Sequence, residues 1–272
     1  MRGPISILSL AALWAVVPVW AQLPAPNEAG VAMGHLHLNV RGEALEAHKK
    51  FWIALGGTPT KMNMFEVIKF PDVLVFLNLP SQVDPAPGGN EGTVVQHVGF
   101  RVRNLQDSLA KWKAAGLKTA PGQNPTQVYV VAPNEMRIEI SEDRSLTVPI
   151  ANDHIHLFVR EVGSVEDIKA WYVKLFGAKP GKRGENDAVD LPGVNLTFSI
   201  SPTAIVGTRG RVLDHIGFEI TDLAAFCEKL EASGVKFDVP YRKLASPNGL
   251  GLAFITDPWG TYIELNQGLT GL

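Results

Sequence analysis

Histidine is concentrated in a few short segments of this chain. The sequence of 272 residues contains seven histidines. Six of them lie in segments that read HLHLNV, HVGFRV, HIHLFV and HIGFEI, and they are His35, His37, His97, His154, His156 and His215. Imidazole suits borderline divalent metals and also serves as a general base near neutral pH. These segments are therefore candidates for metal binding or acid–base chemistry.

The four segments alternate aliphatic and other residues, which predicts β-strands with one buried face. In HIHLFV the aliphatic residues take one face, so His154 and His156 share the other. In HIGFEI the same phase aligns His215 with His154. Glu264, in the later segment YIEL, also points away from its aliphatic neighbours. These polar side chains are expected on the concave face of a sheet, opposite the helices.

Two imidazoles and one carboxylate on separate strands form the ligand set of facial-triad Fe(II) sites and of some catalytic zinc sites. Three protein ligands leave room for water and substrate, and the ion polarises a bound oxygen. A single inward histidine is usually a hydrogen-bonded core residue, but a set that occurs twice favours metal binding. We expect one triad in each half of the chain: His154, His215 and Glu264 in the second half, and His35, His97 and Glu139 in the first.

The histidines next to these ligands have a second assignment. His37 and His156 each lie two residues after an expected ligand, on the same strand face. We predict that they act as a general base or hydrogen-bond a substrate. Packing beside the ligands is the alternative. His48 lies in an expected helix, should be partly exposed, and has no functional assignment.

An internal duplication organises the whole chain. Residues 35–40 match 154–159, residues 97–102 match 215–220, and residues 137–140 match 262–265, in the same order. Repeats at such a spacing determine how a fold is interpreted, so they come before any single element. Each half divides again into two segments with an opening strand, an amphipathic helix and further short strands.

The duplication predicts an α+β fold of four tandem βαβββ units. We expect the units to pair within each half and to form two cupped-sheet domains, residues 33–145 and 150–268. The stretch 141–153, which contains Pro149, is the expected boundary between them.

Paired units with histidine in the opening strands and glutamate in the last strand resemble the vicinal oxygen chelate superfamily. This family includes glyoxalases, extradiol ring-cleaving dioxygenases and bleomycin-resistance binding proteins. The resemblance covers residues 33–268 and is sharpest in DPWGTYIE, residues 257–264. It implies glyoxalase/dioxygenase-like domains in which two units close around one metal, with ligands at the six positions named above.

The chain also departs from the family pattern. Glyoxalase I takes a fourth ligand from a strand that corresponds here to residues 73–79 and 194–200, which contain no acidic residue or histidine. Extradiol dioxygenases place a tyrosine ahead of the Asp-Pro turn and a histidine before it. Phe254 stands at that tyrosine position in the second half, whereas Tyr129 occupies it in the first, where Glu135 replaces the turn glycine. The acid–base groups of ring cleavage are therefore incomplete in both halves.

The resemblance implies a divalent-metal-dependent enzyme with Fe, Zn, Ni or Mn as its cofactor. Its substrate would be a small oxygenated organic molecule chelated to the metal, and lyase, isomerase and dioxygenase chemistries all stay open. The alternative is a non-catalytic small-molecule binding protein of the bleomycin-resistance type, which the missing dioxygenase residues favour. The two retained triads favour the enzyme.

Composition narrows the range of partners. The 25 basic and 27 acidic residues give a net charge of −2, which argues against a nucleic-acid surface or a polybasic membrane anchor. The single cysteine, Cys227, excludes an intramolecular disulfide and a cysteine-based metal site. A small-molecule substrate is the expected partner, and a homo-oligomer stays open.

Residues 1–21 are typical of a secretory signal peptide. Arg2 precedes an apolar run, and small residues stand at the −3 and −1 positions before Gln22. We expect an exported protein, periplasmic or secreted, with no membrane attachment after cleavage. An uncleaved membrane anchor is the alternative.

We predict that the mature chain begins at Gln22. The intact mass of protein isolated from its native envelope measures this directly. A mass that retains residues 1–21 would favour the anchored form.

Overall fold

The computed structural model describes residues 23–40, 42, 44–77, 89–161, 163–245 and 249–270. The expected signal peptide, residues 1–21, lies outside the described residues and stays a prediction. Among the helices of the described part, none is long and apolar enough to cross a membrane.

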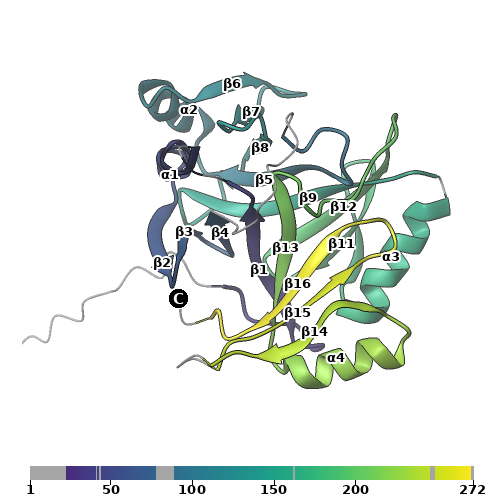
Figure 1. Cartoon of the computed structure of the whole chain (residues 1–272). Coiled ribbons are helices and arrows are strands. Elements are labelled where there is room, and N and C mark those ends of the chain that lie inside the picture. Colours follow the sequence, from purple (N-terminus) through teal and green to yellow (C-terminus); the bar gives the residue numbers. More distant parts are fainter. Residues whose placement is uncertain are drawn as a thin grey trace, which may run out of the picture.

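Four units follow one another, and each has the order strand, helix, strand, strand, strand (Figure 1). Unit 1 contains β1 (Val31–Leu38), α1 (Ala44–Leu55), β2 (Thr58–Met62), β3 (Phe65–Phe70) and β4 (Val73–Leu77). Unit 2 contains β5 (Val95–Val102), α2 (Leu105–Ala114), β6 (Lys118–Pro121), β7 (Gln127–Val131) and β8 (Arg137–Glu142). Unit 3 contains β9 (Ile150–Val159), α3 (Gly163–Phe176), β10 (Lys179–Arg183), β11 (Asn186–Leu191) and β12 (Val194–Ile200). Unit 4 contains β13 (Leu213–Ile220), α4 (Leu223–Ala232), β14 (Phe237–Lys243), β15 (Gly251–Thr256) and β16 (Tyr262–Gln267).

The strands form two mixed eight-stranded sheets, so the predicted α+β fold of βαβββ units is confirmed. The first sheet joins units 1 and 4 in the order β14-β15-β16-β13-β1-β4-β3-β2. The second sheet joins units 3 and 2 in the order β10-β11-β12-β9-β5-β8-β7-β6. Each sheet therefore combines units from both halves of the chain.

This pairing corrects one part of the expected organisation. We expected residues 33–145 and 150–268 each to hold a cupped sheet of their own, but each sheet draws one unit from each range. Packing between helices, in contrast, stays within a half. The Trp112 indole of α2 donates to the Leu55 carbonyl of α1, and the Phe176 ring of α3 lies 5.6 Å from the Phe226 ring of α4.

The lengths of the connections explain the pairing. Only residues 143–149 separate β8 from β9, whereas 78–94 separate β4 from β5 and 201–212 separate β12 from β13. Elements joined by a short connection usually stay close together, and units 2 and 3 share one sheet, in which β5 lies between β9 and β8. The expected domain boundary at residues 141–153 thus lies inside the second sheet.

Alternation along each opening strand separates the core from the concave face. In β9 the side chains of Ile155, Leu157 and Val159 are fully buried in one continuous apolar core. The same alternation directs His154 and His156 to the opposite face, as predicted.

His48 differs from the expectation of partial exposure, because only 1% of it is exposed. It lies on the buried face of α1 together with Phe51, Trp52 and Leu55, at helical spacing. Burial disfavours the charged imidazole and lowers the pKa of His48 to about 4. The folded protein therefore keeps this histidine neutral.

We predict that His48 makes stability fall in acid. The unfolded chain protonates this side chain near pH 6.5 and the folded chain only near about 4, so stability is lost as the pH falls through that window. Between about pH 7.5 and about pH 4.5 the His48→Leu variant should lose about 2 kcal/mol less free energy of unfolding than the parent. Urea unfolding at both pH values measures this, and equal losses in the two proteins would contradict it.

Candidate metal centres

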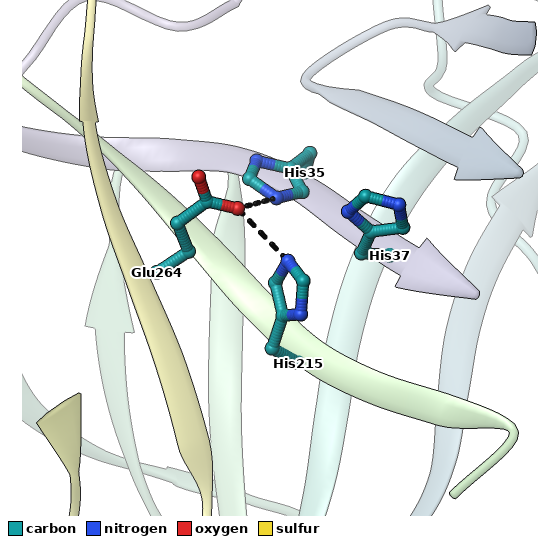
Figure 2. A group of neighbouring side chains, drawn as sticks. All are labelled: His35, His37, His215 and Glu264. Carbon is teal, nitrogen blue, oxygen red and sulfur yellow. Dashed lines mark hydrogen bonds and ion pairs between the residues drawn. The ribbon is translucent and has the colours of Figure 1, made fainter. Parts of the chain in front are cut away.

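The first sheet gathers four candidate ligands on its concave face (Figure 2). His35 and His37 come from β1, His215 from β13 and Glu264 from β16, and all four are buried. One ligand atom from each lies within 4.8 Å of the others. Glu264 Oε2 lies 2.9 Å from His215 Nε2 and 3.2 Å from His35 Nε2. We name this group the first centre.

The second sheet holds an equivalent group, the second centre. It consists of His97 from β5, Glu139 from β8 and His154 from β9, all buried. His97 Nε2 lies 2.8 Å from His154 Nε2 and 3.1 Å from Glu139 Oε2. His154 Nε2 lies 3.7 Å from Glu139 Oε1.

Each of the six expected ligands lies in one of the two centres, but in a different grouping from the one expected. His215 and Glu264 meet, as do His97 and Glu139. His35 joins the former pair and His154 the latter, because β1 pairs with β13 and β9 with β5. The expected convergence within each half was therefore wrong for two triads: His154, His215 and Glu264, and His35, His97 and Glu139.

A glycine across the strand pair makes room for one histidine in each centre. Gly217 lies opposite His35, and Gly99 lies opposite His154. A Cβ atom at Gly217 would lie 2.1 Å from His35 Cε1, and one at Gly99 would lie 2.1 Å from His154 Cε1. The glycine of each H-x-G segment thus serves a histidine from the other half of the chain, a role that our alignment within halves did not detect.

The residue before each opening histidine lies at a shift in strand register. These residues are Gly34, Gln96, Asp153 and Asp214. Such a bulge re-aims a side chain out of the normal alternation. As a result, three of these residues can reach the imidazole that follows them.

Those three side chains orient the ligand histidines. The Nδ1 atoms of His215 and His154 lie 2.7 Å from Asp214 Oδ1 and 2.9 Å from Asp153 Oδ2. His97 Nδ1 donates to Gln96 Oε1 in the same way. A histidine that donates from Nδ1 presents its Nε2 lone pair to a metal. Sequence reasoning missed this role, although the repeated Asp-His pair was visible.

The donor set of the second centre fits a cation. Because His97 and His154 both donate from Nδ1, their Nε2 lone pairs face one another at 2.8 Å, beside the Glu139 carboxylate. Acceptors at this distance repel one another unless a positive charge lies between them. Two imidazoles and one carboxylate therefore converge here as a divalent-metal site requires.

The carboxylates of both centres stay ionised at neutral pH. Burial opposes ionisation of Glu139, but the neighbouring imidazoles of His97 and His154 together outweigh it and lower the pKa to about 2. Burial likewise opposes ionisation of Glu264, and hydrogen bonds with His215 and His35 hold its pKa well below the usual value. Burial disfavours a charged His215, yet hydrogen bonds to Asp214 and Glu264 raise its pKa to about 9. In the first centre, protonated His215 thus supplies positive charge beside the Glu264 carboxylate, where a metal ion would otherwise supply it.

The two histidines predicted to assist catalysis have different surroundings. His37 belongs to the first centre, where its ring lies 4.6 Å from that of His215 and 5.4 Å from that of Phe76. His156 is not grouped with the second centre's ligands, and its Nε2 lies 2.7 Å from Ser199 Oγ. Burial lowers the pKa of His156 to about 3 and that of His37 well below its usual value. Both are neutral bases near a centre, and His37 also lies within reach of the metal position.

Comparisons with known proteins agree with this fold. Residues 153–265 match the model of the Glyoxalase/Bleomycin resistance protein/Dioxygenase superfamily. The fold is similar to glyoxalase I from Zea mays, with a TM-score of 0.68 and 15% identity over 89% of this chain and 94% of that one. It is also similar to a protein from Bacillus subtilis subsp. subtilis str. 168, with a TM-score of 0.60 and 12% identity over 91% and 86% of the chains. No curated protein matches the sequence.

We predict that alanine at each facing glycine removes one metal. Gly217→Ala places a methyl group in the space of the His35 imidazole, so divalent-metal affinity at the first centre should fall by about ten-fold or more. Gly99→Ala should do the same at the second centre. Titration of each variant with Co(II) measures the affinity of both centres. A single substitution that weakens both centres, or neither, would contradict the cross-half pairing.

Proposed function

Because residues 153–265 match the Glyoxalase/Bleomycin resistance protein/Dioxygenase superfamily, we propose that this chain is a divalent-metal-dependent enzyme. Its substrate is a small oxygenated organic molecule that binds the metal through neighbouring oxygen atoms. The reaction is of the lyase or isomerase type at the first centre. Fe, Zn, Ni and Mn all suit ligands of this kind.

The observation that carries this proposal is the convergence of imidazole and carboxylate groups at the first centre. His35, His215 and Glu264 would hold the ion from three different strands. When bound, the ion polarises a substrate oxygen and so acidifies the neighbouring C–H or O–H group. Three protein ligands leave positions for the two oxygens of such a substrate.

His37 supplies the base for this reaction. It is buried and neutral, and its ring lies beside that of His215. A neutral imidazole at this place accepts a proton from the substrate and returns it to a different atom. This transfer replaces the acid–base groups of ring cleavage, which the sequence lacks.

Aromatic rings form an apolar wall beside His37, and one of them, Phe76, also contacts the ligand His35. Phe65 and Phe76 each lie 5.4 Å from the His37 ring, measured between ring centroids. Phe76 also belongs to an apolar cluster with Val67 and Leu74. An apolar wall excludes water, which strengthens electrostatic interactions between the ion and the substrate.

Metal content of the full chain tests the proposal. The parent should bind a divalent metal at each centre, so His35→Ala should lose the metal of the first centre and His97→Ala that of the second. His156→Ala is the matched control, because it lies on a ligand strand but outside the ligand group, and it should keep both metals. Metal analysis with chelator competition measures all four proteins. Equal metal content in the parent, His35→Ala and His97→Ala would overturn the metal function.

Proton transfer at the substrate separates the enzyme from a binding protein. The metal-loaded parent should catalyse deuterium exchange at the hydroxyl-bearing carbon of a vicinal hydroxycarbonyl compound, and His37→Ala should lose this exchange. Proton NMR in deuterated buffer follows the reaction. Tight binding of such compounds with no exchange would favour the non-catalytic alternative.

A further inference from the structure

The two sheets are built alike, so each position on one concave face has a counterpart on the other. His35 pairs with Leu74 on β4, and its counterpart His154 pairs with Asn195 on β12. At the outer edge of each sheet, Met62 lies opposite Phe65 and Arg183 lies opposite Asn186. Side chains at these equivalent positions can therefore be compared directly.

The walls beside the two centres differ in polarity at four of the five compared positions. Beside the first centre the wall is apolar, and it consists of Met62, Phe65, Val67, Leu74 and Phe76. The equivalent positions beside the second centre are mostly polar or charged, and they hold Arg183, Asn186, Ala188, Asn195 and Thr197. The small molecules that bind against these two walls must therefore also differ in polarity.

Arg183 brings a guanidinium group to the second centre. It donates to Asp153 Oδ2, and its Nη2 lies 3.8 Å from Glu139 Oε1. About a third of the side chain is accessible, with a fractional exposure of 30%. A guanidinium carries five N–H donors in a planar fork, so the bond to Asp153 leaves further donors for a ligand. The first centre has the thioether of Met62 at this position.

A second pair of equivalent positions also differs in charge between the two centres. Arg101 on β5 lies 3.1 Å from Asp153 Oδ1, whereas its counterpart Glu219 on β13 accepts the backbone N–H groups of Gly268 and Leu269. Two arginines that share Asp153 therefore flank the second centre. The counterpart of Arg101 beside the first centre is a carboxylate that accepts from the backbone.

A cavity lies near the second centre, although neither Arg183 nor a ligand of that centre is among its lining residues. Its volume is about 330 Å³, and its lining includes Gln96, Arg137 and Phe158. Gln96 accepts from the ligand His97, and the Phe158 ring lies 5.7 Å from the His156 ring. The cavity is thus one residue away from the ligand His97, and Glu91 and Glu135 line it together with Arg137.

We propose that the second centre binds a small carboxylate whose charged group pairs with Arg183, while the first centre takes a ligand with an apolar body. Arginine binds a planar carboxylate through two parallel charge-assisted hydrogen bonds. An apolar wall offers nothing to replace the water that a carboxylate loses on burial. The two centres are in this view two sites of different specificity, and the inference rests on the proposed metal function.

Pyruvate and its neutral methyl ester are the probes for the experiment. His215→Ala leaves the second centre alone intact, and His97→Ala leaves the first, so each centre is loaded with Co(II) separately. Pyruvate should perturb the visible Co(II) spectrum of the His215→Ala protein. Adding Arg183→Met should weaken pyruvate binding by about ten-fold or more while Co(II) affinity and methyl pyruvate binding stay unchanged. The reciprocal Met62→Arg in the His97→Ala protein should strengthen pyruvate binding at the first centre.

The results distinguish failure of the carboxylate site at Arg183 from failure of the proposed metal function. Pyruvate affinity that stays within about two-fold after Arg183→Met would overturn this inference alone. If Arg183→Met loses its Co(II), Met62→Arg decides instead, and no gain of pyruvate affinity there would overturn the inference. A parent chain that binds no Co(II) at either centre would overturn the proposed function and this inference with it.

Discussion

Both centres depend on one structural constraint, the antiparallel pairing of an opening strand from one half of the chain with an opening strand from the other. In each pair a histidine lies over a glycine, with no space for a Cβ atom between them. The register shift beside the histidine turns the side chain of the preceding residue toward the imidazole, except at Gly34, which has no side chain. Close approach, ring orientation and ligand geometry therefore all follow from the register of two strand pairs.

The first centre shows how the same scaffold accommodates a different set of groups. Gly34 has no side chain to hold His35, and His35 Nδ1 is buried without a hydrogen-bond partner. In the second centre both ligand histidines are held, by Gln96 and Asp153. The first centre instead gains His37 as a fourth neighbour. Its ligand sphere is less constrained and more apolar than that of the second centre.

Much of this arrangement could be predicted from the sequence. Strand alternation placed His154, His215 and Glu264 on concave faces, and the duplication indicated four βαβββ units. The repeat alone could not predict the choice of partners, because duplicated units offer equivalent strands for pairing and a repeat carries no information about which ones meet. The lengths of the three connections do carry that information, and the short one at residues 143–149 is visible in the sequence. Arg183 was missed for another reason, since it reaches the second centre from an edge strand far away along the chain.

The order of the ligands along the chain also has a consequence for assembly. The second centre uses residues 97 to 154, and these lie entirely between His35 and Glu264 of the first centre. In sequence order, the ligands of the second centre thus lie between those of the first centre. A chain that folds from its N-terminus can complete the second centre once unit 3 has formed, whereas the first centre requires the last strand. An ion at the first centre closes a much longer loop of the chain, so it constrains more of the unfolded chain than an ion at the second centre does.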